Sequence, residues 1–335
     1  MNQENSHKGG LTNLVYLSYG REVEYYRTLF AIFSAVAWYT GSAGAFRIIL
    51  YTDKPEVFEP YLSDIQIEYY TLTPEILKQM LGKSDYIHRR KIAVVELTAN
   101  RYPNENLIFL DSDTFFKADT HSLLDRLQAG SSLMHKREFT IANGLSIFAS
   151  YNEAEEPQAF VNYITTNNIT IDHSEEHFGV EEFCWNSGVL GLHIDSYKYL
   201  PDVMKTSDMF YAHSKWFIIE QLAFSFVLQL KTEVKACDDL IIHYWGKRQK
   251  VLIDSLIKAE FEKESVENLK NKRYCQELTL SWEKKVKNDI IIEQVVICIG
   301  AKAWFFAIKK LIQLSLKNPF NFRLYPVIYK EVKSG

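Results

Sequence analysis

The chain has 335 residues and a mass of 39.0 kDa, a length that suggests about two domains. Hydrophobic residues make up 47% and charged residues 24% of the chain, so a large core can form and a mainly disordered protein is excluded. With 38 Lys and Arg against 42 Asp and Glu the net charge is −4, which gives the whole chain no electrostatic reason to bind nucleic acid.

The first half of the chain alternates apolar strands with amphipathic helices. Residues 13–19 form an apolar run typical of a buried strand, and apolar side chains follow at helical spacing up to residue 37. Further strands are expected at residues 46–51, 65–69 and 106–110, and helices at residues 74–81 and 87–100. This succession of strands and helices predicts an α/β fold with a mainly parallel sheet flanked by helices.

The second half is less regular. Strands are expected at residues 187–193 and 240–244, with a helix at residues 216–230 between them. A charged stretch at residues 258–273 is typical of an exposed helix. No linker separates the halves, and the sequence has no internal repeat.

Two carboxylates follow directly after the strand at residues 106–110. Because side chains alternate along an extended chain, Asp111 and Asp113 are expected to point the same way at the carboxyl edge of the sheet. Two anionic oxygens held there suit a hard divalent cation, magnesium or manganese, which can neutralise a diphosphate. The alternative is a turn or a cap, in which aspartate is also common.

Two later segments carry further polar groups. His243 ends an apolar run and is followed by Gly246 and Lys247; it could be a third metal ligand beside a cation for phosphate, or a hydrogen-bonded core histidine. Asn186 and Ser187 place an amide and a hydroxyl just before the strand at residues 187–193. These groups could bind a polyhydroxylated ligand or simply form a turn.

Four blocks occur in the order FLDSDTFF, WNSGVLGLH, IEQLAFSF and IIHYWGK. In this order they resemble the glycogenin-like, family 8 glycosyltransferases with a GT-A fold. Those enzymes carry a strand ending in D-x-D, an N-S-G segment, an acidic residue followed by Gln on a helix, and an H-x-x-G-x-x-K ending. The resemblance covers about residues 13–250 and implies a GT-A catalytic domain at residues 11–250. The residues that follow, 251–335, are expected from their own sequence to form a helical, basic C-terminal extension.

The resemblance implies a metal site and a nucleotide site. Asp111, Asp113 and His243 would bind the divalent metal. Tyr25, with Tyr19 as its neighbour, is expected to pack on the uracil. The full set of residues implied at the nucleotide-sugar is Ser18, Tyr19, Tyr25, Thr52, Asp53, Lys91, Ser112, Ser187, Gly188, Gly246 and Lys247.

At the reacting sugar the resemblance implies Asn186, Glu220 and Gln221, with Asn186 and Glu220 as positioning groups. Two positions depart from the family pattern. Gln249 stands six residues after His243, where the family has a basic residue, and Glu220 stands where relatives have Asp. The phosphate contacts and the reach toward the sugar are therefore expected to differ from the family pattern.

The activity implied is metal-dependent transfer of a sugar from a UDP-sugar to an acceptor hydroxyl, with retention, in glycan or cell-surface polysaccharide synthesis. The acceptor would be a glycan, a lipid-linked molecule or a protein. One alternative is a haloacid dehalogenase-type phosphatase, in which Asp111 would be the nucleophile, Asp113 the general acid and Asp238-Asp239 the late acidic pair. A second alternative is a nucleotide-sugar binding protein without turnover.

The C-terminal tail differs in charge from the rest of the chain. In residues 294–335, six lysines and Arg323 against Glu331 give a net charge of +6, which leaves −10 for the remainder of a chain whose total is −4. Charged residues interrupt its apolar runs well before the roughly 18 residues of a membrane-spanning helix. The tail could lie on an anionic membrane with Trp304 and Phe305 buried, or pack against the catalytic domain.

Cysteine usage and the N-terminal segment bear on location. The four cysteines lie dozens of residues apart without a C-x-x-C pair, which argues against structural zinc and fits a reducing compartment. Residues 1–10 are polar and lack the apolar core of a secretory signal. We therefore expect a cytoplasmic protein, with peripheral contact at the inner membrane surface through its tail.

Overall fold

The computed structural model describes residues 11–149, 154–300, 304–317, 326 and 328–329. The chain divides into two compact units, one ending at His243 and the other starting at Tyr244. The first unit contains the described strands, and the second is helical. The expected boundary at residue 250 lies within the first helix of the second unit, which begins at Lys247.

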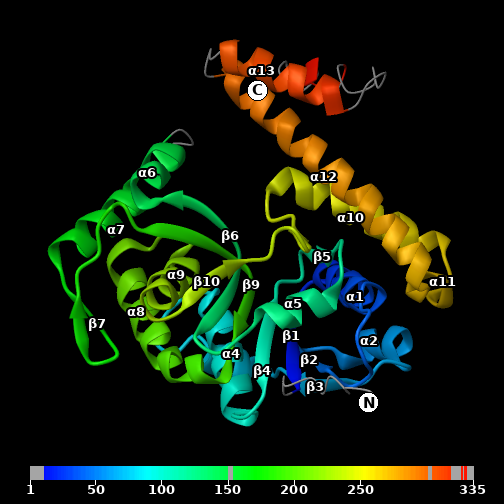
Figure 1. The fold of residues 1–335 in the computed structure, drawn as a ribbon, viewed down its shortest axis with the longest axis horizontal. Helices are drawn as coiled ribbons and strands as arrows, with labels where there is room; N and C mark the ends of the chain where they lie inside the picture. Colours follow the sequence, from blue (N-terminus) through cyan, green and yellow to red (C-terminus); the bar gives the residue numbers. More distant parts are fainter. Residues whose placement is uncertain (1–10, 150–153, 301–303, 318–325, 327, 330–335) are drawn as a thin grey trace, which may run out of the picture. The chain divides into compact units, whose positions relative to one another are not determined.

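A seven-stranded sheet forms the centre of the first unit (Figure 1). Its strands, in spatial order, are β10 (Glu233–Ala236), β6 (Ser131–Thr140), β9 (Phe183–Leu192), β4 (Asn106–Leu110), β1 (Thr12–Ser18), β2 (Phe46–Thr52) and β3 (Ile67–Thr71). β4, β1, β2 and β3 run parallel, as do β10 and β6, while β9 is antiparallel to both of its neighbours. The central strands β1 and β4 are almost wholly buried, which explains their continuous apolar sequence.

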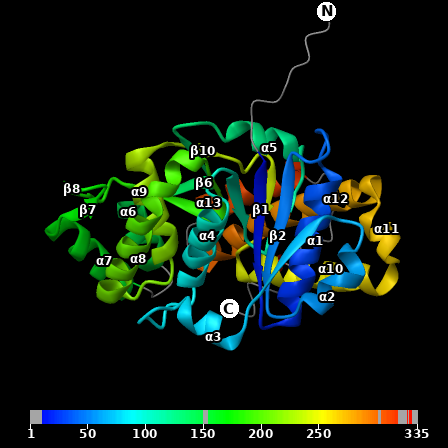
Figure 2. The same ribbon diagram turned by 90° about the horizontal axis from the view of Figure 1, so that it is seen from below.

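Helices pack against this sheet. α1 contacts β1, α4 contacts β1 and β4, and α9 contacts β9 (Figure 2). The helices of the first unit are α1 (Glu22–Ala37), α2 (Pro55–Leu62), α3 (Pro74–Gln79), α4 (Arg89–Arg101), α5 (Thr120–Arg126), α6 (Ile141–Ala149), α7 (Glu155–Thr166), α8 (Leu200–Ser214) and α9 (Ile219–Lys231), with a 3₁₀ turn at Ile194–Tyr199. The predicted class, a mixed α/β fold with a mainly parallel sheet flanked by helices, is confirmed.

Two short strand pairs complete the first unit. β5 (Thr114–Phe116) pairs with β11 (Ile241–His243), and β7 (Ile169–Ile171) pairs with β8 (Ser174–Glu176), both antiparallel. In the first pair His243 lies opposite Thr114. The backbone amide of Asp111 also donates to the Gly188 carbonyl at 2.9 Å, just beyond the β4–β9 ladder. The end of β4 therefore lies beside the middle of β9, and β5, which follows β4, pairs with β11.

The second unit consists of α10 (Lys247–Lys263), α11 (Val266–Lys270), α12 (Lys272–Gly300) and α13 (Trp304–Lys317). The helix expected at residues 258–273 is therefore divided among α10, α11 and α12. Ser265 explains the break, because its hydroxyl accepts from the Asn268 amide and caps α11. Within the described part of the chain, no helix is both long and apolar enough to cross a bilayer.

Candidate active site

The two aspartates after β4 and the histidine ending β11 form one cluster. Asp111, Asp113 and His243 each offer a ligand atom, and these atoms all lie within 4.8 Å of one another. His243 Nε2 is 3.1 Å from Asp113 Oδ1 and 3.8 Å from Asp111 Oδ2. The residues predicted as metal ligands are therefore brought together, although His243 lies 130 positions after Asp113 in the chain.

The imidazole of His243 is oriented by Asn186 on β9. Asn186 Oδ1 accepts from the Gly188 amide at 3.0 Å and lies 2.7 Å from His243 Nδ1. Because an amide oxygen only accepts hydrogen bonds, Nδ1 is the donor in this contact. Nε2 faces the carboxylates and lies 3.1 Å from Asp113 Oδ1, and it is the nitrogen that would bind a metal. Two carboxylates and an imidazole are a donor set that suits Mn²⁺ or Mg²⁺ and leaves positions for other oxygen ligands.

Gly188 leaves room for that ring. A Cβ atom added at this position would overlap the imidazole of His243. Glycine is therefore needed here for close approach of β9 to His243, and its φ angle is not in the left-handed region.

Glu138 on β6 fixes the other end of the Asn186 amide. Its Oε1 accepts from Asn186 Nδ2 at 3.2 Å, and its Oε2 accepts from Gln221 Nε2 at 3.1 Å. Gln221 Oε1 in turn accepts from the Ser187 amide at 3.2 Å. The predicted Asn186, Ser187 and Gln221 are thus joined through a carboxylate that the motifs do not reveal.

Lys91 on α4 is the cation at the centre of the site. Its Nζ lies 2.9 Å from Asp111 Oδ2, 3.2 Å from both the carbonyl and the hydroxyl oxygen of Ser187, and 3.5 Å from Glu220 Oε1. Burial by itself lowers the pKa of this ammonium group, but the carboxylates of Asp111 and Glu220 outweigh it, and the pKa of Lys91 is raised.

Glu220 is almost fully buried beside Lys91, with 4% of the residue exposed. Its Oε2 accepts from the Ser187 hydroxyl at 3.1 Å, and its backbone amide donates to the Tyr86 hydroxyl at 2.8 Å. Burial raises the pKa of Glu220 to about 7 in spite of the nearby ammonium group. Lys91 lowers the pKa of Glu220 but does not offset the effect of burial, because Lys91 lies closer to Asp111 than to Glu220. The negative charge of Asp111 also raises the pKa of Glu220.

The ends of β1 and β2 bring a second predicted group together. Asp53 accepts from the Tyr25 hydroxyl at 2.9 Å and from the Gly20 amide at 3.1 Å. The Tyr25 ring is only 2% exposed and meets the ring of Phe58 edge-on. A uracil packing on Tyr25 would therefore need this ring to be uncovered first.

Tyr19 presents the more accessible ring of the two. It is partly exposed, and the guanidinium carbon of Arg90 lies 5.1 Å from its ring centre. Arg90 also donates to the Tyr19 hydroxyl at 3.0 Å. The predicted Thr52 and Ser18 lie buried at the ends of β2 and β1, and the Ser18 hydroxyl has no hydrogen-bond partner among the described residues.

Ser112, between the two aspartates, is held from α1. Its hydroxyl donates to Glu24 Oε2 at 2.7 Å, and Glu24 Oε1 accepts from Arg27 at 2.9 Å. Arg21, Glu24 and Arg27 have the i,i+3 spacing of helical ion pairs. This spacing is a sequence signal from which Glu24 could have been recognised as a structural residue near the site. No comparable signal identifies Glu138, because the charged residues at positions 136–138 hide the strand that carries it.

Gly246 and Lys247 belong to the second unit. Gly246 is the N-cap residue of α10, and Lys247 is its first residue. Gln249, which stands where the resembling family has a basic residue, is buried and donates to Asp289 Oδ2 at 2.8 Å and Glu293 Oε2 at 3.2 Å on α12. In this chain the side chain at position 249 therefore links α10 to α12.

Comparison with known proteins gives similarity to solved structures only. No family model matches the chain, and no curated protein matches it. It is similar to the apo form of mouse xyloside xylosyltransferase 1 (TM-score 0.43, 13% identity, 68% of this chain and 85% of that chain). It is also similar to the bifunctional glycosyltransferase WbbM (TM-score 0.43, 13% identity, 70% and 40%) and to the glycosyltransferase GlyE of Streptococcus pneumoniae TIGR4 (TM-score 0.47, 10% identity, 80% and 64%). Each of these three is a glycosyltransferase by name, and the chain spans less than two thirds of WbbM and of GlyE.

Replacing Gly188 with alanine tests the position of His243. We expect Gly188→Ala to weaken Mn²⁺ binding by about 10- to 100-fold, because the added methyl group displaces the imidazole from the two aspartates. Calorimetric titration with Mn²⁺ measures this. The control is Gly179→Ala, whose new Cβ would have its nearest neighbour at 4.0 Å. Equal Mn²⁺ affinity of both variants would show that His243 is not a ligand.

The pKa of Glu220 predicts a pH-dependent stability. A carboxyl group whose pKa is raised to about 7 on folding stabilises the protein most below its unfolded pKa, and this contribution is lost as pH rises through 7. Relative to Glu220→Gln, the free energy of unfolding of the wild type should fall by roughly 3 kcal/mol between about pH 5 and pH 8. Urea unfolding in chelator measures it, with the exposed Glu233→Gln as control. A pH-independent difference would mean that Glu220 stays ionised beside Lys91.

Proposed function

We propose that this protein is a metal-dependent glycosyltransferase with a GT-A fold that moves a sugar from a nucleotide diphosphate to an acceptor hydroxyl. The observation that carries the proposal is the cluster of Asp111, Asp113 and His243 at the carboxyl edge of a mainly parallel sheet. This edge is where α/β folds bind nucleotides. The cluster unites the D-x-D block and the final histidine block of the resemblance to family 8 enzymes.

The metal site would serve the diphosphate of the donor. Asp111, Asp113 and His243 would hold Mn²⁺ or Mg²⁺, which supplies positive charge to a diphosphate leaving group. Asp111 and Asp113 would also contact the ribose side of the nucleotide, with Ser112 held in place by Glu24. Gly246 and Lys247, three and four residues after His243 in the chain, are proposed to meet the diphosphate.

The nucleotide is proposed to be a uridine diphosphate. Ser18, Thr52 and Asp53 lie at the ends of adjacent parallel strands, where a uridine would bind. Of the two tyrosines, Tyr19 is the better platform for the base because its ring is less buried than that of Tyr25. Arg90, which contacts Tyr19, keeps that ring in place.

The sugar is proposed to lie against the network of Asn186, Ser187, Gly188, Glu220 and Gln221. Each side chain in this network is held by another, so the polar atoms that would meet the sugar are fixed before it binds. Glu220, with its pKa near 7, is able to donate or accept a hydrogen bond at neutral pH. We assign Asn186 and Glu220 to positioning of the sugar, in a transfer that retains the anomeric configuration.

The donor is proposed to be a UDP-hexose, and the acceptor a glycan, a lipid-linked molecule or a protein in glycan or cell-surface polysaccharide synthesis. A phosphatase of the haloacid dehalogenase type is less well supported. Its late acidic pair would include Asp239, but Arg126 donates to both carboxylate oxygens of Asp239, at 2.6 and 2.5 Å. Within the described residues Asp239 is not part of the cluster around Asp111.

Metal-dependent binding of UDP is the first test. We expect UDP to bind with Mn²⁺ and not with chelator, and Asp113→Asn to weaken binding by more than about 100-fold, because the metal loses an anionic ligand. Isothermal titration calorimetry measures this, with the exposed Asp238→Asn as matched control. No UDP binding under any condition would contradict the proposal. The phosphatase would then be tested by phosphate release from small phosphomonoesters, which Asp238→Asn should impair.

The role of Glu220 separates an enzyme from a silent binding protein. We expect the wild type to hydrolyse one UDP-hexose slowly, and Glu220→Gln to reduce this rate by roughly 100-fold while changing UDP affinity by less than about threefold, since it acts on the sugar. Release of UDP is the measurement, and Glu233→Gln is the control. Tight donor binding without UDP release, with or without added acceptors, would identify a binding protein.

A further inference from the structure

Helix α13 is apolar on two opposite faces. Its inner face packs within the second unit: Ala307 and Leu314 are buried, and Leu314 belongs to a cluster with Val295 on α12. This contact joins α12 and α13 as a helical pair. One side of α13 is therefore covered within the second unit.

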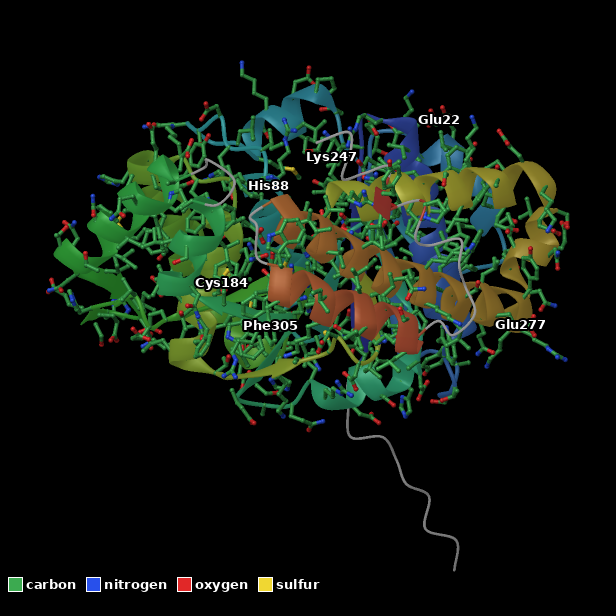
Figure 3. All side chains as sticks on the ribbon, turned by 90° about the horizontal axis from the view of Figure 1, so that it is seen from above. Glu22, His88, Cys184, Lys247, Glu277 and Phe305 are labelled. Carbon is green, nitrogen blue, oxygen red and sulfur yellow. The ribbon has the colours of Figure 1, made fainter. Side chains whose placement is uncertain are left out.

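The outer face of α13 carries large apolar side chains in contact with solvent. Phe305 is 75% exposed, Ile308 56%, Ile312 55% and Leu316 77%. Their spacing of three, four and four residues places them in one stripe along the helix, on the side away from Leu314. Figure 3 labels Phe305 on this helix. Exposed apolar residues are ordinary when scattered, but a continuous stripe of this length marks a contact surface.

Every charged residue of α13 is a lysine. Within α13, Lys309, Lys310 and Lys317 are the charged residues, and the helix has no acidic residue. Lys309 is largely exposed and follows Ile308 directly, so its ammonium group lies beside the apolar stripe. The surrounding residues 294–335 carry a net charge of +6, against −10 for the rest of the chain.

We propose that the outer face of α13 docks on an anionic lipid surface, with Phe305, Ile308, Ile312 and Leu316 below the headgroups. Apolar insertion and attraction of lysines to anionic headgroups act together in helices of this kind. A helix of 14 residues is about 21 Å long, so it lies along the surface. A second copy on this face would bring two sets of lysines together, which disfavours self-association. This docking does not depend on the proposed sugar transfer.

Vesicle flotation of the full chain tests the docking. We expect binding to phosphatidylcholine–phosphatidylglycerol vesicles and at least about tenfold weaker binding to pure phosphatidylcholine. The variant Phe305→Ser/Ile308→Ser/Ile312→Ser should weaken binding to the mixed vesicles by at least about tenfold. Its control is Val251→Ser/Leu280→Ser/Leu230→Ser, which removes three exposed apolar side chains outside α13 and should change binding by less than about twofold. Circular dichroism checks that both variants fold.

Four results would overturn the proposal. The lipid contact is contradicted if the wild type does not float with anionic vesicles. It is also contradicted if the variant Phe305→Ser/Ile308→Ser/Ile312→Ser floats as well as the wild type. A dimer that is lost in the face variant, seen by sedimentation velocity without vesicles, identifies a second copy as the partner. Binding that appears only when the chain is cut after Lys317 would mean that the following residues cover the face in the full chain.

Discussion

One buried ammonium group holds the carboxylates of Asp111 and Glu220 together at the candidate site. Lys91 faces Asp111 at 2.9 Å and Glu220 at 3.5 Å, and Asp113 contributes to its raised pKa. Without this cation, three acidic groups would converge at one sheet edge with little solvent to separate their charges. Because Lys91 also contacts the backbone and hydroxyl of Ser187, the same group joins the carboxylates to β9. The placement of α4 against β1 and β4 is thus an electrostatic requirement as well as a packing one.

The metal-ligand geometry follows from strand register. β11 is only three residues long, yet its pairing with β5 places His243 opposite Thr114, next to Asp113. The ring can occupy this position only because residue 188 has no side chain, and it keeps its orientation because Asn186 accepts from Nδ1. A backbone shift of one residue in either strand would reverse the direction of these side chains.

Local patterns were sufficient for part of this description. The buried strands β1 and β4 are visible as unbroken apolar runs, and Asp111 and Asp113 follow one of them directly, so the fold class and the acidic half of the site could be predicted. The position of His243 at a strand end made it a candidate ligand. These are short-range signals, because each prediction depends on residues that are neighbours in the chain.

The remaining residues depend on contacts between distant segments. Glu138 is 48 positions from Asn186 and 83 from Gln221, and its strand has shifts of register against β9 that no periodicity reveals. The burial of Tyr25 depends on where Phe58 of α2 packs. Such facts follow from tertiary packing, which overrides local pattern.

At position 249 this chain has Gln where the resembling family has a basic residue, although His243 and Gly246 of the same motif are present. Gly246 retains its place before α10, and a Cβ there would collide with the Gln249 side chain. Gln249 is buried and bonded to two acidic residues of α12, so it offers no charge to a ligand. For the proposed diphosphate donor, this chain therefore lacks the family's additional cation at position 249. Donor binding would then depend more heavily on a metal at Asp111, Asp113 and His243 than it would in a site with that basic residue.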